Sequence, residues 1–230
     1  MKILGYSERG VMNALFYGMA FNDDVKGMQK FLTKAGIEGE FSEFELYMEW
    51  SLSDFGNPDL IITAKDGNKE QVIIFVEAKV SSQQYYNYKK EKEKYDKYIG
   101  KKKYDSNMSS NLFFQLKEKF ELFEKRNDVG LSNGEGLPKD KTSLNSKNGK
   151  NRKIGTSGVV LAMMKRIKDS NKAHYIAIIP EQNEELNQPE DFKIHIVYWE
   201  DLKDDYSKYL KETIDFNKGE VKSQILNILK

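Results

Sequence analysis

The segment QVIIFVEAKV, residues 71–80, constrains the fold of this chain most strongly. Its apolar run from Val72 to Val76 is rich in β-branched side chains, which favours a strand. Successive side chains of a strand point to opposite faces of the sheet, so this strand needs apolar cover on both faces. At 230 residues, the chain is long enough to supply that cover. We therefore expect an α/β fold with a central strand at 71–80.

Further elements are expected on both sides of this strand. Residues 44–52 alternate, which predicts a half-buried strand with Leu46, Met48, Trp50 and Leu52 on one face. A turn at 56–58 leads into the β-branched strand DLIITA. The remaining expectations are helices at 7–21 (N-cap Ser7), 24–35 (ended by Gly36), 82–99, 111–126, from Asp201 and from about 220, and strands at about 158–164, 174–179 and 193–199.

Residues 127–157 consist mainly of Gly, Asn, Ser and Lys, with almost no apolar side chains. This composition predicts a long mobile loop. The strands expected after it still need a sheet to join, so we interpret residues 1–230 as a single domain. The predicted order is two helices, three strands, two helices, the loop, three strands and a closing helix.

The formal net charge of +1 conceals an uneven distribution along the chain. Residues 1–78 carry a net charge of −6, residues 79–180 carry +12, and residues 181–230 carry −5. A basic middle segment in a nearly neutral chain is typical of a surface that binds a polyanion. The alternative interpretation is an ordinary solvated surface rich in lysine.

The chain contains no cysteine, which excludes disulfides, thiolate nucleophiles and cysteine-based metal sites. This absence favours a reducing compartment, and we expect a cytoplasmic protein. The apolar runs are too short for a membrane-spanning helix, so we expect no membrane association.

Charged residues stand where strands normally carry none. Asp59 precedes the strand DLIITA, and Glu77 and Lys79 end the strand at 71–80. Residues two apart project from the same face of a sheet, so Glu77 and Lys79 share one face. Two carboxylates beside apolar strands are costly to bury unless a hard cation, such as a divalent metal ion, compensates them. Lys79 is then suited to orient a water molecule or to stabilise developing negative charge.

Pro58-Asp59, followed by Glu77-Ala78-Lys79, resembles the motif of the PD-(D/E)XK nuclease superfamily. The resemblance implies a restriction-endonuclease-like αβββαβ core with a central mixed sheet flanked by helices, extended here by C-terminal strands and helices. It implies that Asp59, Glu77 and the Ala78 carbonyl bind Mg²⁺ or Mn²⁺ and that Lys79 activates the attacking water. It also implies an acidic residue on the first helix, for which Glu8 is the candidate, and a Gln-x-x-x-Tyr motif beginning at Gln84.

Each of these residues also has a simpler interpretation. Asp59 follows Asn57-Pro58 and could cap a turn. Glu77 and Lys79 could be a weak surface pair at the end of an edge strand. Glu8 is favourable in the first turn of a helix through the macrodipole alone. Glu45 and Glu49 could line the same cleft, although solvation is the simpler expectation.

The segment 85–104 interleaves six tyrosines with eight lysines, a composition suited to binding nucleic acid. Tyr88, Tyr95 and Ile99 form one helical stripe and are expected to pack on the sheet. The candidate phosphate-binding residues are Lys89, Lys90, Lys94, Lys97, Lys101, Lys102 and Lys103. The two histidines, His174 and His195, show no ligand pattern, and we expect structural roles for them.

The combined hypothesis is a Mg²⁺-dependent nuclease that hydrolyses phosphodiester bonds in nucleic acid, with DNA as the expected substrate. The alternative is a catalytically inactive relative that binds nucleic acid or another protein within a larger complex. The sequence contains no recognisable specificity module, so a homodimer or a partner protein that supplies specificity stays open.

Overall fold

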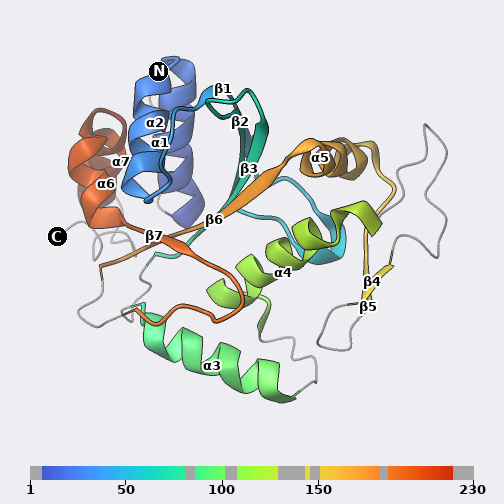
Figure 1. The fold of residues 1–230 in the computed structure, drawn as a ribbon. Helices are drawn as coiled ribbons and strands as arrows, with labels where there is room; N and C mark the ends of the chain where they lie inside the picture. The colour runs from blue at the N-terminus through green and yellow to red at the C-terminus, as the bar shows by residue number, and fades with distance from the viewer. Residues whose placement is uncertain are drawn as a thin grey trace.

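A five-stranded mixed β-sheet with the strand order β1-β2-β3-β6-β7 forms the centre of the computed structural model (Figure 1). The described residues are 7–80, 86–101, 108–128, 143–145, 151–181 and 186–219. The strands are β1 (Ser42–Met48), β2 (Leu60–Lys65), β3 (Gln71–Ala78), β6 (Lys172–Ile179) and β7 (His195–Tyr198). The first three form an antiparallel meander, and β3, β6 and β7 are parallel. The expected α/β class is confirmed.

Helices cover both faces of the sheet in two separate layers (Figure 1). One layer contains α1 (Glu8–Phe21), α2 (Val25–Lys34), α6 (Trp199–Asp205) and α7 (Ser207–Gly219). The other contains α3 (Tyr88–Lys101), α4 (Leu112–Glu124) and α5 (Gly158–Asp169). Within the described residues, no helix is both long and apolar enough to cross a membrane.

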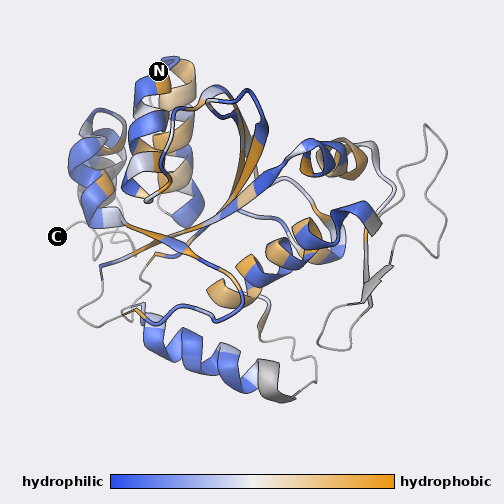
Figure 2. Ribbon diagram, viewed as in Figure 1, coloured by the Kyte–Doolittle hydropathy of each residue, from blue (hydrophilic) through white to orange (hydrophobic). Residues whose placement is uncertain are grey.

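Strand β3 lies in the middle of the sheet and is covered on both faces, as its sequence predicts. Ile74 and Val76 pack toward the α1 layer, whereas Ile73 and Phe75 pack toward the α4 layer. All four side chains are fully buried. Figure 2 shows the apolar colouring of the inner strands against the hydrophilic colouring of α3. Burial of β3 from both sides fixes the position of the residues that follow Val76.

The first two helices begin and end where their sequences predict. The Ser7 side chain accepts a hydrogen bond from the Gly10 N–H at the start of α1. Asp24 caps α2 in the same way through Gly27. Gly36 follows α2 with a φ of +69°, a left-handed conformation that glycine adopts without strain.

The strand expected at 158–164 is wrong, because these residues begin helix α5. Its buried residues, Val160, Met163, Met164 and Ile167, recur at helical spacing, and Ser157 caps the first turn. An apolar run as short as VVLAMM is compatible with either a buried strand or a buried helix. The helical period becomes visible only when the pattern is followed to Ile167.

The alternation expected through 44–52 holds only as far as Met48, where β1 ends. Glu49 has a φ of +50°, which turns the chain. Trp50 therefore packs on the opposite face from Met48, with its ring 5.2 Å from that of Tyr47. Its indole N–H donates a 2.9 Å hydrogen bond to the Val159 carbonyl of α5. Leu52 also belongs to the α4 layer, so the predicted face is wrong for both residues.

Part of the loop predicted at 127–157 is ordered structure. The short strands β4 (Ser143–Asn145) and β5 (Asn151–Lys153) pair with each other, and η3 (Arg126–Asp128) follows α4. Ile154 is buried, and the Gly155 N–H donates a 2.6 Å hydrogen bond to Ser53 in η1 (Ser53–Phe55). Residues 129–142 and 146–150, together with the helix expected from about 220, lie outside the described residues.

The tyrosine stripe of α3 is buried, but it packs on α4 instead of the sheet. The rings of Tyr88 and Tyr95 lie 4.8 Å and 5.8 Å from the ring of Phe113. Helix α4 in turn contacts β3. The correction has a simple physical reason: α4 has buried residues around most of its circumference and occupies the place next to the sheet.

The reassignment of residues 158–164 to a helix predicts how α5 depends on its cap. Ser157→Ala is expected to lower the free energy of unfolding by about 1 kcal/mol, because Val160 loses its hydrogen-bond acceptor. Ser157→Asp is expected to preserve stability. Urea denaturation would measure both changes, with the exposed neighbour substitution Thr156→Ala as control. Equal effects of the alanine and aspartate substitutions would contradict the capped helix.

Candidate active site

The register of the β2–β3 pair places Asp59 beside Glu77. Leu60 pairs with Val76 in this antiparallel pair. Asp59, one residue before Leu60, therefore lies opposite Glu77, one residue after Val76. The Ala78 N–H donates a 2.7 Å hydrogen bond to Oδ2 of Asp59. Lys79 follows at the carboxyl end of β3 and is half-buried. The structure therefore brings together the three residues that carry the sequence motif.

Glu8 reaches the same sheet edge from the first turn of α1. Its Oε2 accepts a 3.2 Å hydrogen bond from the Val80 N–H. Burial raises the pKa of Glu8 to about 7; Lys79 opposes this rise, whereas the negative charges of Asp59 and Glu77 add to it. Glu8 therefore lies within electrostatic reach of Asp59, Glu77 and Lys79, and we call these four residues the carboxylate cluster.

Glu77 is paired with a lysine that the sequence analysis did not identify. Oε1 of Glu77 lies 3.0 Å from Nζ of Lys119 on α4, and the two side chains are 1% and 2% exposed. Burial raises the pKa of the Glu77 carboxyl, and the positive charge of Lys119 opposes that rise. Gly56, with a φ of +79°, borders the same ammonium, because a Cβ there would lie 3.3 Å from Nζ.

The sequence does contain a signal for Lys119. Leu112, Leu116, Lys119 and Phe123 follow one another at the spacing of a single helical stripe. Phe120, the next residue, is only half-buried, so the buried stripe passes through Lys119. A lysine at the centre of an otherwise apolar stripe indicates a buried positive charge, which needs an acidic partner.

Trp199 is a second residue that sequence reasoning missed. Its indole N–H donates a 3.0 Å hydrogen bond to the Lys79 carbonyl, and the side chain is 1% exposed. The Lys79 N–H donates to the Ile178 carbonyl at 2.8 Å. Hydrogen bonds to α6 and β6 thus fix the backbone of Lys79. The side chain of Lys79 takes no part in these two bonds.

The other candidate residues are not grouped with the carboxylate cluster. Lys89, Lys90, Lys94 and Lys97 are exposed on α3, where Lys94 pairs with Glu91 at 3.1 Å. Helix α3 packs on α4, so these lysines lie one layer farther from the sheet. Gln84, Lys102 and Lys103 lie outside the described residues, as does the side chain of Lys101. The contact seen at Ala78 is made by its N–H, and metal binding by its carbonyl stays a prediction.

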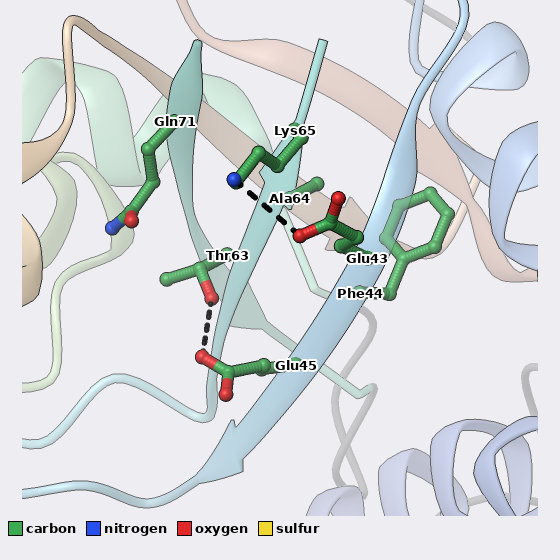
Figure 3. A pocket seen from close by; sticks show the side chains of 7 residues that line it. All are labelled: Glu43, Phe44, Glu45, Thr63, Ala64, Lys65 and Gln71. Atoms are coloured by element: carbon green, nitrogen blue, oxygen red, sulfur yellow. Dashed lines mark hydrogen bonds and ion pairs between the residues drawn. The ribbon is translucent and has the colours of Figure 1, made fainter. Parts of the chain in front are cut away.

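Glu45 does not join the cluster but lines a separate cavity of about 380 Å³ (Figure 3). There it accepts hydrogen bonds from Tyr47 at 2.5 Å and from Thr63 at 3.2 Å. Hydrogen bonding to Tyr47 is the main reason that the pKa of Glu45 is lowered. Glu49 pairs with Arg9 of α1 at 2.6 Å. Both glutamates therefore have local partners, and neither contributes to the carboxylate cluster.

The carboxylate cluster fits magnesium in its donor chemistry and in its small number of ligands. Within the described ranges, no group of three or more His, Cys, Asp or Glu side chains is arranged to hold a metal ion. Magnesium, however, is commonly held by one or two carboxylates together with water and substrate phosphate. Asp59 and Glu77 provide two such carboxylates on adjacent strands. A closed cage of protein ligands is not present in this part of the chain.

No protein-family model, curated protein or solved structure matches this chain.

The buried pair predicts a large effect when one partner is removed. Lys119→Met is expected to lower the free energy of unfolding by about 3–5 kcal/mol, because Glu77 then lies buried without a positive partner. Adding Glu77→Gln is expected to recover part of this loss. The matched control is Lys30→Met, whose exposed pair with Asp205 contributes less than about 1 kcal/mol. Urea denaturation would measure the free energies of unfolding. If the changes caused by Lys119→Met and Glu77→Gln were additive in the double variant, the two side chains would not interact, which would contradict the ion pair.

The raised pKa of Glu8 predicts a pH dependence of stability. A carboxyl whose pKa is higher in the folded protein contributes stability at low pH, and this contribution is lost as the pH rises toward 7. Glu8→Gln removes this term, so the variant is expected to gain up to about 3 kcal/mol over the wild type between about pH 5 and pH 8. Denaturation in the presence of EDTA would measure the difference, with Glu40→Gln as an exposed control. Parallel pH profiles of wild type and Glu8→Gln would contradict the assignment.

Proposed function

We propose that this chain is a Mg²⁺-dependent phosphodiesterase that hydrolyses nucleic acid, with DNA as the expected substrate, on a restriction-endonuclease-like fold. The observation that carries the proposal is the convergence of Glu8, Asp59, Glu77 and Lys79 at the carboxyl end of the central strand. Two carboxylates that could hold a cation, one carboxyl suited to proton transfer and one ammonium are the kinds of group that metal-assisted attack on a phosphodiester uses.

Asp59 and Glu77 are the residues that would hold the ion. Magnesium supplies positive charge for the phosphate oxygens and makes a coordinated water more acidic. The Lys119 ammonium favours the charged form of the Glu77 carboxyl, the form that binds a cation, against the burial that raises its pKa. The Lys79 ammonium stabilises negative charge on the phosphate that undergoes attack.

Glu8 is suited to proton transfer. Its pKa of about 7 lies near neutral pH, where a carboxyl group both accepts and releases a proton readily. The hydrogen bond from the Val80 N–H to Oε2 orients the group, and Oε1 is the atom that would take a proton from water. The exposed lysines of α3 would contact phosphates away from the cleavage point.

The direct test is a cleavage assay with single-stranded, duplex and branched DNA and with RNA, in Mg²⁺, Mn²⁺ or EDTA. Asp59→Asn and Lys79→Met are each expected to lower the metal-dependent rate by about 100-fold or more, because each removes charge from the site of reaction. Both side chains are only half-buried, so the melting temperature is expected to change little.

Glu70→Gln is the matched control, because Glu70 is exposed at the opposite end of the β2–β3 pair. Its activity is expected to equal that of the wild type. Absence of metal-dependent cleavage on every substrate would contradict the proposal, as would full activity of Lys79→Met.

The Glu77–Lys119 pair also favours a second candidate function. Lys119 already compensates the charge of Glu77, so the site does not need a metal ion for neutrality. A non-catalytic domain that binds nucleic acid, alone or with a protein that supplies specificity, is consistent with this arrangement. Salt-dependent DNA binding without cleavage, and without heat on titration with Mg²⁺, would favour this second function.

A further inference from the structure

The sequence Lys-x-His occurs on two neighbouring parallel strands. Lys172-Ala173-His174 begins β6, and Lys193-Ile194-His195 leads into β7. Residues two apart on a strand share one sheet face, so Lys172 lies on the same face as His174. Ile176 pairs with His195, and Lys193 precedes β7 by two residues and lines the same cavity as Lys172 and His174. Both histidines of the chain and two lysines therefore gather at one end of the sheet.

The two imidazole rings are hydrogen-bonded to each other. Nδ1 of His174 lies 3.3 Å from Nε2 of His195, and Nδ1 of His195 lies 2.8 Å from the Ala35 carbonyl. A carbonyl only accepts hydrogen bonds, so Nδ1 of His195 carries a proton. In the neutral ring Nε2 of His195 then accepts from Nδ1 of His174. This arrangement leaves Nε2 of His174 outside both hydrogen bonds.

Positive charge is concentrated here without an equal negative charge. A cavity of about 530 Å³ is lined by both Lys-x-His segments, and Glu38 is the acidic residue among its lining residues. Lys172 and Lys193 are exposed, and neither forms an ion pair within the described residues. Burial lowers the pKa of His174 to about 4, and the two lysines and His195 contribute to that decrease. The pKa of His195 is lowered by burial and by the same lysines, against the hydrogen bond to Ala35.

We infer that this cavity is a binding site for a phosphate-type oxyanion. The ammonium groups of Lys172 and Lys193 would pair with its oxygens, and Nε2 of His174 would take up a proton and donate a third, charge-assisted hydrogen bond. Such an anion relieves the mutual repulsion of the two lysines. A metal cation would experience the same two charges as repulsion, so the cluster favours an anion.

This site is separate from the carboxylate cluster and does not depend on the proposed function. Lys172 is level with Val72, and Glu77 lies five residues farther along the same strand. At about 3.3 Å per residue, this separation is about 17 Å along the sheet. The anion site lies at the amino ends of β6 and β7, and the carboxylate cluster lies at the carboxyl end of β3.

Imidazole NMR provides a direct test, because the chain has two histidines and both belong to the site. The probe is sodium sulfate, which remains a dianion between about pH 5 and pH 8, titrated against sodium chloride at equal ionic strength. The ring nitrogen signals of His174 are expected to shift with saturation in the millimolar range, and binding is expected to be several-fold tighter at the lower pH. Equal shifts with sulfate and chloride would overturn the proposal.

Substitutions of single lysines test whether sulfate binds at this site or responds only to the overall positive charge of the protein. Lys172→Gln and Lys193→Gln are each expected to weaken sulfate binding by about tenfold, the loss of one charge-assisted bond. Lys211→Gln, at an exposed position on α7, is expected to have no effect. Unchanged affinity of both former variants would overturn the proposal. Asp59→Asn, a half-buried substitution in the carboxylate cluster, is expected to bind sulfate normally, so loss of nuclease activity and loss of anion binding are distinguishable.

Two further titrations distinguish the sources of the phosphate group. Inorganic phosphate represents a free anion, and a short oligonucleotide represents a nucleic-acid backbone. Displacement of sulfate by the oligonucleotide would identify the backbone as the source. Displacement by inorganic phosphate alone would identify a free anion. Failure of both to displace bound sulfate would overturn the assignment to a phosphate-type ligand.

Discussion

The ion pair between Glu77 and Lys119 is the interaction on which the rest of this structure depends. Two opposite charges are almost fully buried between β3 and α4, 3.0 Å apart. Neither charge is tolerable there without the other. The pair therefore links α4 to the central strand, and α4 in turn contacts α3. The pair also lies at the carboxyl end of β3. The next residues of the chain are Ala78, whose N–H contacts Asp59, then Lys79, and then Val80, whose N–H contacts Glu8.

The elements that sequence predicted correctly are those with local determinants. The apolar run of β3, the N-cap at Ser7 and the end of α2 before Gly36 need no information from distant residues. Residues 158–164 were predicted as a strand because six apolar residues fit two periods equally well, and the tertiary contacts of α5 decide between them. Trp50 was predicted on the wrong face because a single left-handed residue, Glu49, breaks the alternation.

The sequence predicted those residues of the candidate site whose positions depend only on the pairing of neighbouring strands. Asp59, Glu77 and Lys79 come together because β2 and β3 are consecutive antiparallel strands. Lys119 and the His174–His195 pair depend on helix placement and on a parallel crossover, which a single sequence does not specify. The sequence nevertheless contains a signal for Lys119, because this lysine interrupts an apolar helical stripe. Nothing in the local pattern of either histidine indicates the other.

The parallel pairing of β3 with β6 has a consequence for how the protein is made. Val72 pairs with Lys172, so the ribosome must synthesise a further hundred residues before the central strand gains its second neighbour. Until then the β1–β3 meander presents an apolar strand with an unpaired edge, the kind of surface that promotes association between nascent chains. Pairing across such a sequence separation also slows folding, because the loop must close before any contact is gained. The order of the strands therefore lengthens the time for which this edge of β3 stays unpaired during synthesis.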